Sequence, residues 1–208
     1  MFSIILDGFT VGLLLQMAIG PVFFFILNIS VQKTVLDGLF AVAAVTLVDY
    51  LYIALAILGV GKLLEKRRIK YVMGIVSSLV LGVFGVMMIT SITKTAVAGA
   101  SKIVGVSNYL SSFVSAFLLT LSSPLTIVFW TSLFATKAIE KGYSKEELVP
   151  FGFAAGLATL TFLGLSVTLL STVRASIPTI VIRTLNIIVG ALLIVYGIIR
   201  LFKTYHER

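Results

Sequence analysis

The sequence predicts an all-α integral membrane protein with six membrane-spanning helices. Of its 208 residues, 59% are hydrophobic and only 12% are charged, whereas a soluble domain carries about 25% charged residues. The mean hydropathy is +1.15. The charges lie in short stretches between apolar runs, and each run has about the 20 residues that cross a bilayer. At this length we expect residues 1–208 to form a single transmembrane domain.

Six apolar runs are long enough to cross a membrane: residues 3–29, 38–61, 71–92, 109–136, 149–171 and 179–202. The first run has neither a basic region nor a small-residue cleavage site before it, so we interpret it as a retained helix. The first and fourth runs are longer than one span needs, and each contains a proline near its middle, Pro21 and Pro124. Proline lacks the amide hydrogen of the helical ladder and clashes with the preceding turn, so we expect both helices to be broken there.

The basic residues predict the orientation of the spans. With the N-terminus in the cytoplasm, eleven of the 16 fall in cytoplasmic loops or tails: Lys62, Lys66, Arg67, Arg68, Lys70, Lys137, Lys141, Lys145, Arg200, Lys203 and Arg208. The other five fall outside: Lys33, Lys94, Lys102, Arg174 and Arg183. Cytoplasmic loops are enriched in Lys and Arg, so both termini are expected in the cytoplasm. The cluster at 62–70 is first a topology signal and second a possible binder of lipid headgroups.

The first and fourth runs also resemble each other. Placing Pro21 on Pro124 aligns small residues without gaps: Gly8 with Ser111, Gly12 with Ser115 and Gly20 with Ser123. We therefore predict two repeats, residues 1–100 and 101–208, with three spans each. An odd number of spans gives the two repeats opposite topology. Inverted repeats of this kind are typical of transporters, whose substrate site lies near the bilayer midplane between the repeats.

The two predicted breaks, Gly20-Pro21 and Ser122-Ser123-Pro124, are candidate parts of such a site. Unpaired backbone groups are tolerated in a membrane only inside protein or against a water-filled cavity. The helix that restarts after a break directs its positive N-terminal end at that cavity, which suits a carboxylate. The alternative is that the prolines only shape helix packing.

Asp49 is the acidic residue that falls near the middle of a predicted span. Placing a carboxylate there costs about 2.5–3.5 kcal/mol on insertion scales. The central part of each span has no Lys or Arg to form a permanent ion pair. We therefore expect Asp49 to hold a transported proton or the amine of a substrate. The alternative is a protonated Asp that only bonds to a neighbouring helix.

Four other polar residues in the spans could complete the site: Gln16, Asn28, Thr120 and Asn186. Each of them could equally well join two helices by hydrogen bonds. Trp130, Tyr50, Tyr52 and Tyr196 are more typical of packing or of the membrane interface. The glycine pairs Gly8 and Gly12, and Gly82 and Gly85, are expected to permit close helix contact.

Several other classes of function find little support. The chain has no Cys, and its single His, His206, lies in the C-terminal tail, so we expect no metal site and no cofactor. The basic residues do not share a polar face, so nucleic acid is not an expected partner. An intramembrane protease would need a Ser–His pair or a second central Asp, so an enzyme is not expected. Export of a hard inorganic cation held by Asp49 and backbone carbonyls, and a channel, stay open as alternatives.

Several of these features occur together in one transporter family: the Gly-rich start that leads to Gly20-Pro21, Asp49 followed by Gly59 and Gly61, the run 113–130 with its central proline, and the last helix with Gly190 and Gly197. In these features the chain resembles the LysE/RhtB family of amino-acid exporters over nearly its full length. It departs from the family where Ala18-Ile19-Gly20-Pro21 lacks the first proline of a Pro-Gly-Pro motif and where Ser123 replaces Asn. The resemblance implies a dimeric amino-acid exporter of the prokaryotic plasma (inner) membrane, surrounded by lipid and driven by the proton gradient.

Overall fold

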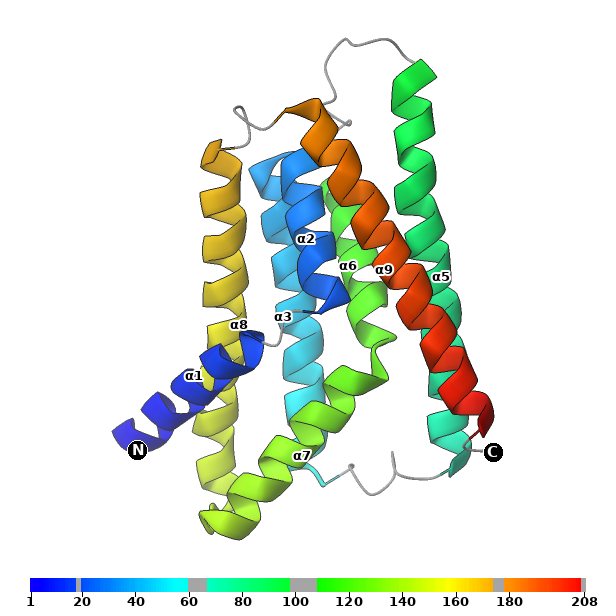
Figure 1. Ribbon diagram of the computed structural model, residues 1–208. Helices are drawn as coiled ribbons and strands as arrows, with labels where there is room; N and C mark the ends of the chain where they lie inside the picture. The colour runs from blue at the N-terminus through cyan, green and yellow to red at the C-terminus, as the bar shows by residue number, and fades with distance from the viewer. Residues whose placement is uncertain (18–19, 60–66, 98–107, 174–177, 207–208) are drawn as a thin grey trace.

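The computed structural model describes residues 1–17, 20–59, 67–97, 108–173 and 178–206, and this part of the chain contains helices and no strand. The helices are α1 (Phe2–Gln16), α2 (Pro21–Gln32), α3 (Val35–Ile57), α5 (Arg67–Val97), α6 (Tyr109–Leu121), α7 (Pro124–Glu140), α8 (Lys145–Val173) and α9 (Thr179–His206) (Figure 1). The predicted all-α class is confirmed. Eight residues named above lie outside the described residues: Ala18, Ile19, Gly61, Lys62, Lys66, Lys102, Arg174 and Arg208.

Four helices are long and apolar enough to cross a membrane by themselves, in the stretches Val35–Ile57, Tyr71–Thr90, Lys145–Thr172 and Ile180–His206. The pairs α1 with α2 and α6 with α7 each form a further span if the two bent halves are counted together. The described helices therefore provide four to six spans, and the upper number is the predicted one. The chain is a multi-pass membrane protein.

The two bent spans turn at the predicted prolines. Pro21 is the first residue of α2 and Pro124 the first residue of α7. The halves are bent by 80° in the first pair and by 60° in the second. Proline suits the first position of a helix because the amide hydrogen that it lacks would have no partner there. The last carbonyls of the helix before each break then need donors from elsewhere. At the end of α6, the hydroxyl of Tyr52 donates to the carbonyl of Leu121 at 2.6 Å.

The helix α3 begins three residues earlier than its predicted span. The side chain of Thr34 accepts a hydrogen bond from the amide of Asp37, and the carboxylate of Asp37 accepts one from the amide of Thr34. This reciprocal capping box stabilises the first turn of a helix. It places Asp37 inside α3, where its side chain is fully buried.

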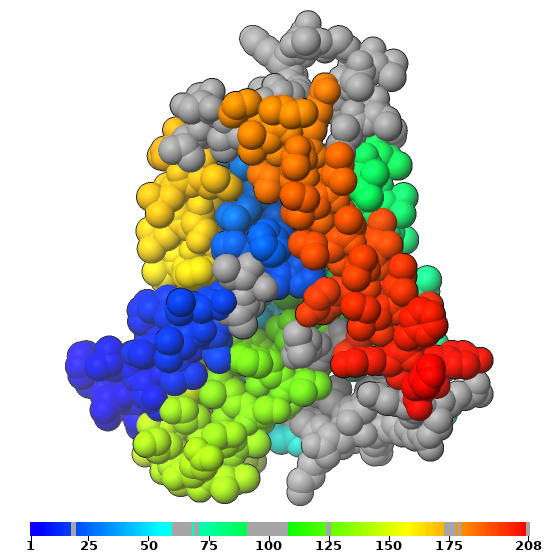
Figure 2. Space-filling view, in the orientation of Figure 1, coloured from blue at the N-terminus to red at the C-terminus, as the bar shows by residue number. Residues whose placement is uncertain are grey.

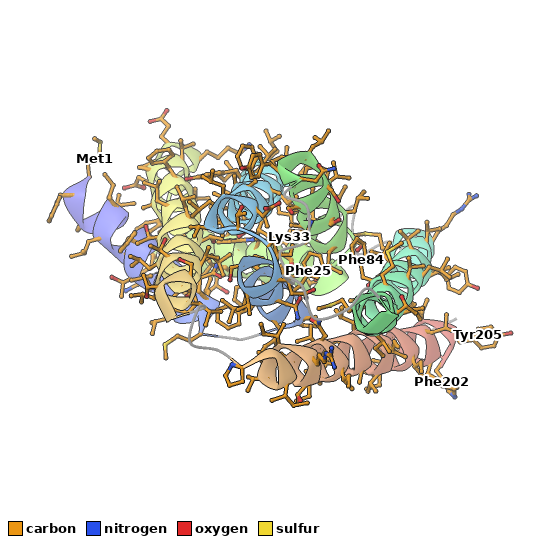
Figure 3. The ribbon with its side chains drawn as sticks, turned by 90° about the horizontal axis from the view of Figure 1, so that it is seen from above. Met1, Phe25, Lys33, Phe84, Phe202 and Tyr205 are labelled. Carbon is orange, nitrogen blue, oxygen red and sulfur yellow. The ribbon has the colours of Figure 1, made fainter. Side chains whose placement is uncertain are left out.

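The helices α3 and α8 pack against each other, and α6 also packs on α3 while α1 packs on α8. In the view from above, α1 and α8 lie on one flank of the molecule and α5 and α9 lie side by side on the other (Figure 3). Phe25 of α2 and Phe84 of α5 point toward each other between the centre and the second flank. Their ring centroids are 5.4 Å apart with an interplanar angle of 85°.

Glycines allow two of these helix pairs to approach closely. A Cβ atom on Gly12 of α1 would lie 2.7 Å from the carbonyl oxygen of Ala155 in α8. On the other flank, a Cβ atom on Gly85 would lie 2.6 Å from the carbonyl oxygen of Gly190. Small residues at such contacts are typical of helix pairs in membranes. The predicted close contact is confirmed at these glycines and at Gly8, but a Cβ atom on Gly82 would meet nothing within 4 Å.

Both termini lie at the same end of the molecule, the lower end in Figure 1, which we call the basic end. The described members of the larger basic set all lie in helix ends or turns there: Arg67, Arg68, Lys70, Lys137, Lys141, Lys145, Arg200 and Lys203. The described members of the smaller set, Lys33, Lys94 and Arg183, lie toward the opposite end. The separation of the two sets agrees with the predicted loops, and the cytoplasmic location of the basic end stays a prediction.

Candidate functional site

A cavity of about 180 Å³ lies at the two helix breaks, and we call it the Asp49 cavity. Six of the predicted site residues line it: Gln16, Gly20, Pro21, Asp49, Thr120 and Ser123. The other lining residues are Leu15, Val22, Phe23, Val45, Thr126, Phe129, Trp130 and Leu163. The fold therefore brings residues from α1, α2, α3, α6, α7 and α8 to one place.

Two helix N-termini border this cavity. Gly20 precedes α2 with an extended backbone, and Ser123 precedes α7; neither helix start has a hydrogen bond from a capping side chain. The first amides of a helix have no partner within the helix and carry a partial positive charge. Since Pro21 has no amide hydrogen, the amide of Val22 is the first donor of α2. The two breaks thus present backbone donors that suit an anionic group.

Asp49 provides the negative charge of the cavity. Its side chain is 4% exposed. Its Oδ1 atom accepts a hydrogen bond from Nε1 of Trp130 at 3.0 Å, and its Oδ2 atom accepts one from the hydroxyl of Thr159 at 2.9 Å. An ionised carboxylate can accept about four hydrogen bonds, so the donors of the described residues leave roughly two acceptor positions for a ligand.

A second layer of hydrogen bonds fixes the orientation of Thr159. The side-chain amide of Gln16 donates to the Thr159 hydroxyl at 2.7 Å. That hydroxyl has a single hydrogen, which it donates to Asp49. A directed chain therefore runs from α1 through α8 to α3, and it holds the Asp49 carboxylate in position.

Among the residues that the structure describes, Asp49 has no counter-ion. The ion pair in this part of the chain joins Lys137 to Asp7 at 2.6 Å. That pair lies toward the basic end and links α7 to α1. The hydroxyl of Tyr143 also donates to Asp7, at 3.2 Å. Burial, followed by the hydrogen bond to Asp7, raises the pKa of Tyr143 above its ordinary value.

The remaining predicted site residues lie elsewhere or take another role. Asn28 and Asn186 belong to a cluster of three amides between α2 and α9. Asn28 donates to Asn186, and Gln32 donates to the side-chain oxygens of both asparagines. Ser122 donates to the carbonyl of Leu119 at 3.0 Å. Neither the amide cluster nor Ser122 lines the Asp49 cavity.

Two residues that hold Asp49 were not among the predicted site residues. Trp130, which the sequence suggested for packing or the interface, is 2% exposed and bonds directly to Asp49. Thr159 is fully buried in α8. They lie 81 and 110 positions from Asp49 along the chain, so local sequence gives no signal of the contact. A Trp in the run that follows a predicted break is the one hint that the sequence holds.

Comparisons of the sequence with known proteins show which family the chain resembles. The family profile described as LysE type translocator matches residues 13–203. The chain is 25% identical over 203 residues to the "Putative amino acid efflux protein YcgF" of Bacillus subtilis (strain 168), with 94% of this chain and 93% of that protein covered. No solved structure matches the chain. Because the family profile spans most of the chain, including every residue that lines the Asp49 cavity, the chain belongs to the LysE type translocator family.

Proposed function

We propose that the chain exports amino acids, or closely related small metabolites, by secondary active transport coupled to protons. Membership of a translocator family and the similarity to a protein named for amino acid efflux support an exporter. The observation that carries the finer proposal is the Asp49 cavity itself. One carboxylate and the N-terminal ends of two half-helices border the same small space.

This arrangement is complementary to a zwitterion. The carboxylate of an amino acid would accept hydrogen bonds from the first amides of α2 and α7. Its ammonium group would donate to the free acceptor positions of Asp49. Either charge alone would be poorly placed in this cavity, because the opposite pole would remain uncompensated.

The rest of the lining favours a neutral amino acid. Leu15, Val22, Phe23, Val45, Phe129 and Leu163 give the cavity apolar walls. Of the described residues that line it, Asp49 alone is acidic. A second amine on the cargo would find no carboxylate there, whereas an apolar side chain would gain from burial.

The reason for proton coupling is the free-energy cost of a charged Asp49 side chain with no cargo bound to it. When the ammonium group of the cargo departs, a bare carboxylate within the membrane becomes expensive. A proton taken up by the same carboxylate removes that charge. Proton and amine would therefore compete for Asp49, and this competition would couple inward proton movement to outward movement of the cargo.

The proposed transport cycle also uses the predicted repeats. The packing of α1 on α8 has a counterpart in the packing of α6 on α3, as expected if residues 1–100 and 101–208 are inverted repeats. Both repeats contribute one broken helix to the cavity. Such pairs of repeats can rock about a fixed midplane site to expose it to each side in turn.

The test is counterflow in proteoliposomes with a panel of labelled amino acids at a fixed pH gradient. We expect saturable exchange of a few neutral amino acids, dependent on the gradient and lost in Asp49→Asn. The variant should fold, because Asn can still accept from Trp130 and can donate to Thr159. Exchange of no amino acid by well-folded protein would contradict the proposal and move attention to hard cations or to a channel.

Asp37→Asn is the matched control. It makes the same substitution in a buried acid of the same helix, but Asp37 does not line the cavity. We expect this variant to retain the substrate KM of the wild type, measured on folded protein. Equal loss of exchange in both variants would show that any buried acid of α3 is required for folding, and the specific role of Asp49 would fall.

A further inference from the structure

A second cavity lies on the other side of the same two helix breaks. Its volume is about 290 Å³, and it is lined by Pro21, Val22, Ser77, Leu81, Leu119, Ser123, Tyr196, Ile199, Arg200 and Lys203. We call it the Arg200 cavity. Three of its lining residues, Pro21, Val22 and Ser123, also line the Asp49 cavity. The two cavities therefore meet at the N-terminal ends of α2 and α7.

The charge of the Arg200 cavity is opposite to that of the Asp49 cavity. Among the residues that the structure describes, Arg200 and Lys203 line it, and no Asp or Glu does. The Nε atom of Arg200 is buried and has no hydrogen-bond partner among the described residues. Within the described part of the chain, neither of these two cations forms an ion pair. Two uncompensated cations beside apolar walls attract an anionic group.

The position of this cavity gives it a place in transport. Arg200 and Lys203 lie near the C-terminal end of α9, which runs the length of one face of the molecule and ends at the basic end (Figure 2). If the basic end is cytoplasmic, as predicted, cargo that enters from the cytosol meets these two cations before it meets Asp49. The neutral polar groups of Ser77 and Tyr196 line the same space.

We propose that the Arg200 cavity is a loading site for the carboxylate of the cargo, and more generally for small monocarboxylates. Arg200 and Lys203 hold the carboxylate at the cytosolic side, and the amides at the starts of α2 and α7 receive it as the cargo moves to Asp49. That the cargo is an amino acid rests on the function proposed above. The binding of a carboxylate at Arg200 and Lys203 does not depend on it.

Equilibrium binding tests the site without any transport. The full-length protein in phosphatidylcholine nanodiscs is titrated calorimetrically with propionate and, separately, with propionamide, which has the same shape but no charge. We expect propionate to bind and propionamide to bind at least about tenfold more weakly, since a charge-assisted hydrogen bond contributes more than a neutral one. Equal binding of the two probes, or no binding of propionate, overturns the proposal.

The variants Arg200→Gln and Lys203→Gln locate the binding. Each should weaken propionate binding at least about tenfold, and Arg200→Lys, which keeps the charge, should restore most of it. Arg183→Gln is the matched control, because Arg183 is also in α9 and also has a buried Nε without a partner, yet lines neither cavity. An equal loss in Arg183→Gln would show a general charge effect and would contradict the site. If Arg200→Gln does not fold, the variant Lys203→Gln, at an exposed position, and the variant Arg200→Lys still show whether propionate binds at these two cations.

An anionic lipid headgroup is the competing source of the same chemistry. In nanodiscs that also contain phosphatidylglycerol, propionate should bind with unchanged affinity. Loss of propionate binding there, with retention of phosphatidylglycerol that depends on Arg200, would assign the cavity to lipid and overturn the loading site.

Transport separates the failure of this inference from the failure of the proposed function. Wild-type exchange of amino acids, with an unchanged KM from the basic end in Arg200→Gln, would leave the exporter intact and refute the loading site. Propionate binding that depends on Arg200, without exchange of any amino acid, would support a carboxylate site at Arg200 and refute the amino-acid exporter. Support for both requires a KM raised at least about tenfold from the basic end and unchanged from the opposite end.

Discussion

Two buried carboxylates on the same helix, Asp37 and Asp49, have opposite surroundings. Asp37, near the start of α3, accepts hydrogen bonds from the amide and hydroxyl of Thr34, the amide of Asn108 and the hydroxyl of Ser112, at distances of 2.7–3.3 Å. Asp49, in the middle of α3, accepts two from the described part of the chain, from Trp130 and Thr159. Asp49 also borders the Asp49 cavity, whereas Asp37 lines neither that cavity nor the Arg200 cavity.

This difference separates a structural acid from one that is available to a ligand. A carboxylate has about four acceptor positions, and protein donors fill all of them on Asp37. Its charge is therefore compensated in every state that keeps the starts of α3 and α6 together. On Asp49 the donors of the described residues leave about half of the positions open. These donors offset part of the cost of burying the charge, and a ligand or a proton can offset the rest.

The largest expected effects come from exchanging the two acids for Asn and measuring each variant in two ways. Asp49→Asn should lower the exchange rate at least about 100-fold, because loss of one partner of a buried charge pair costs about 2–5 kcal/mol. Its stability should change little. Asp37→Asn should leave the KM unchanged and lower the free energy of unfolding by about 2 kcal/mol, because an Asn amide would face the amide of Thr34 as a second donor. Denaturant unfolding and counterflow, run on the same preparations, check both variants. Loss of exchange in Asp37→Asn together with loss of stability in Asp49→Asn would make Asp37 the acid that binds cargo and Asp49 the structural one.

Trp130→Phe should have the next largest effect. It keeps an aromatic ring in the core but removes the donor to Oδ1 of Asp49. We expect the cargo KM to rise about tenfold, since a hydrogen bond to a charged group contributes about 1.5–3 kcal/mol. The control is Phe134→Leu, which changes a buried neighbour of the Trp130 ring without touching Asp49. A similar KM rise in both variants would reduce the role of Trp130 to packing.

Thr159→Val compares the second donor of Asp49 with a donor of Asp37. It should raise the KM about threefold to tenfold, because a buried carboxylate oxygen and the Gln16 amide both lose a partner. Ser112→Ala removes one of the four donors of Asp37 and should reduce stability by about 1 kcal/mol with no change in KM. Counterflow and denaturant unfolding measure the pair. An unchanged KM in Thr159→Val would show that the orientation of Asp49 does not depend on α8.

Gln16→Leu should have the smallest effect of the series. Gln16 acts on Asp49 only through Thr159, so its loss should raise the KM about twofold to threefold, the lower end for a neutral hydrogen bond. The double variant Gln16→Leu/Thr159→Val should then be no worse than Thr159→Val alone. A double-mutant cycle checks this, and additive effects would mean that Gln16 touches the cargo directly.

The sequence was sufficient for the features that depend on local chemistry. Apolar length predicts the spans, and Pro21 and Pro124 predict the breaks because a proline disrupts the helical ladder wherever it stands. An acid in the middle of an apolar run identifies Asp49. The earlier start of α3 was also readable, since Thr34 followed three residues later by Asp37 is a capping pattern.

The contacts between distant segments were not predictable in this way. The bond between Trp130 and Asp49 depends on how α7 packs after its bend, and no local pattern encodes that angle. The separation of Asn28 and Asn186 from the Asp49 cavity depends likewise on the packing of α2 against α9. In a membrane, polar residues on several helices look equally suited to a site, and only the packing decides which of them meet.

The bond between Trp130 and Asp49 has one more consequence. Trp130 is the single tryptophan of the chain, and its indole N–H points at the carboxylate proposed to exchange a proton for cargo. The tryptophan emission of the protein therefore originates at Trp130 alone, in direct contact with the proposed coupling residue Asp49. Each change in the charge of Asp49 should alter the wavelength and intensity of that emission. The intrinsic fluorescence of the unlabelled wild-type protein should therefore report the steps of the cycle in which Asp49 gains or loses charge.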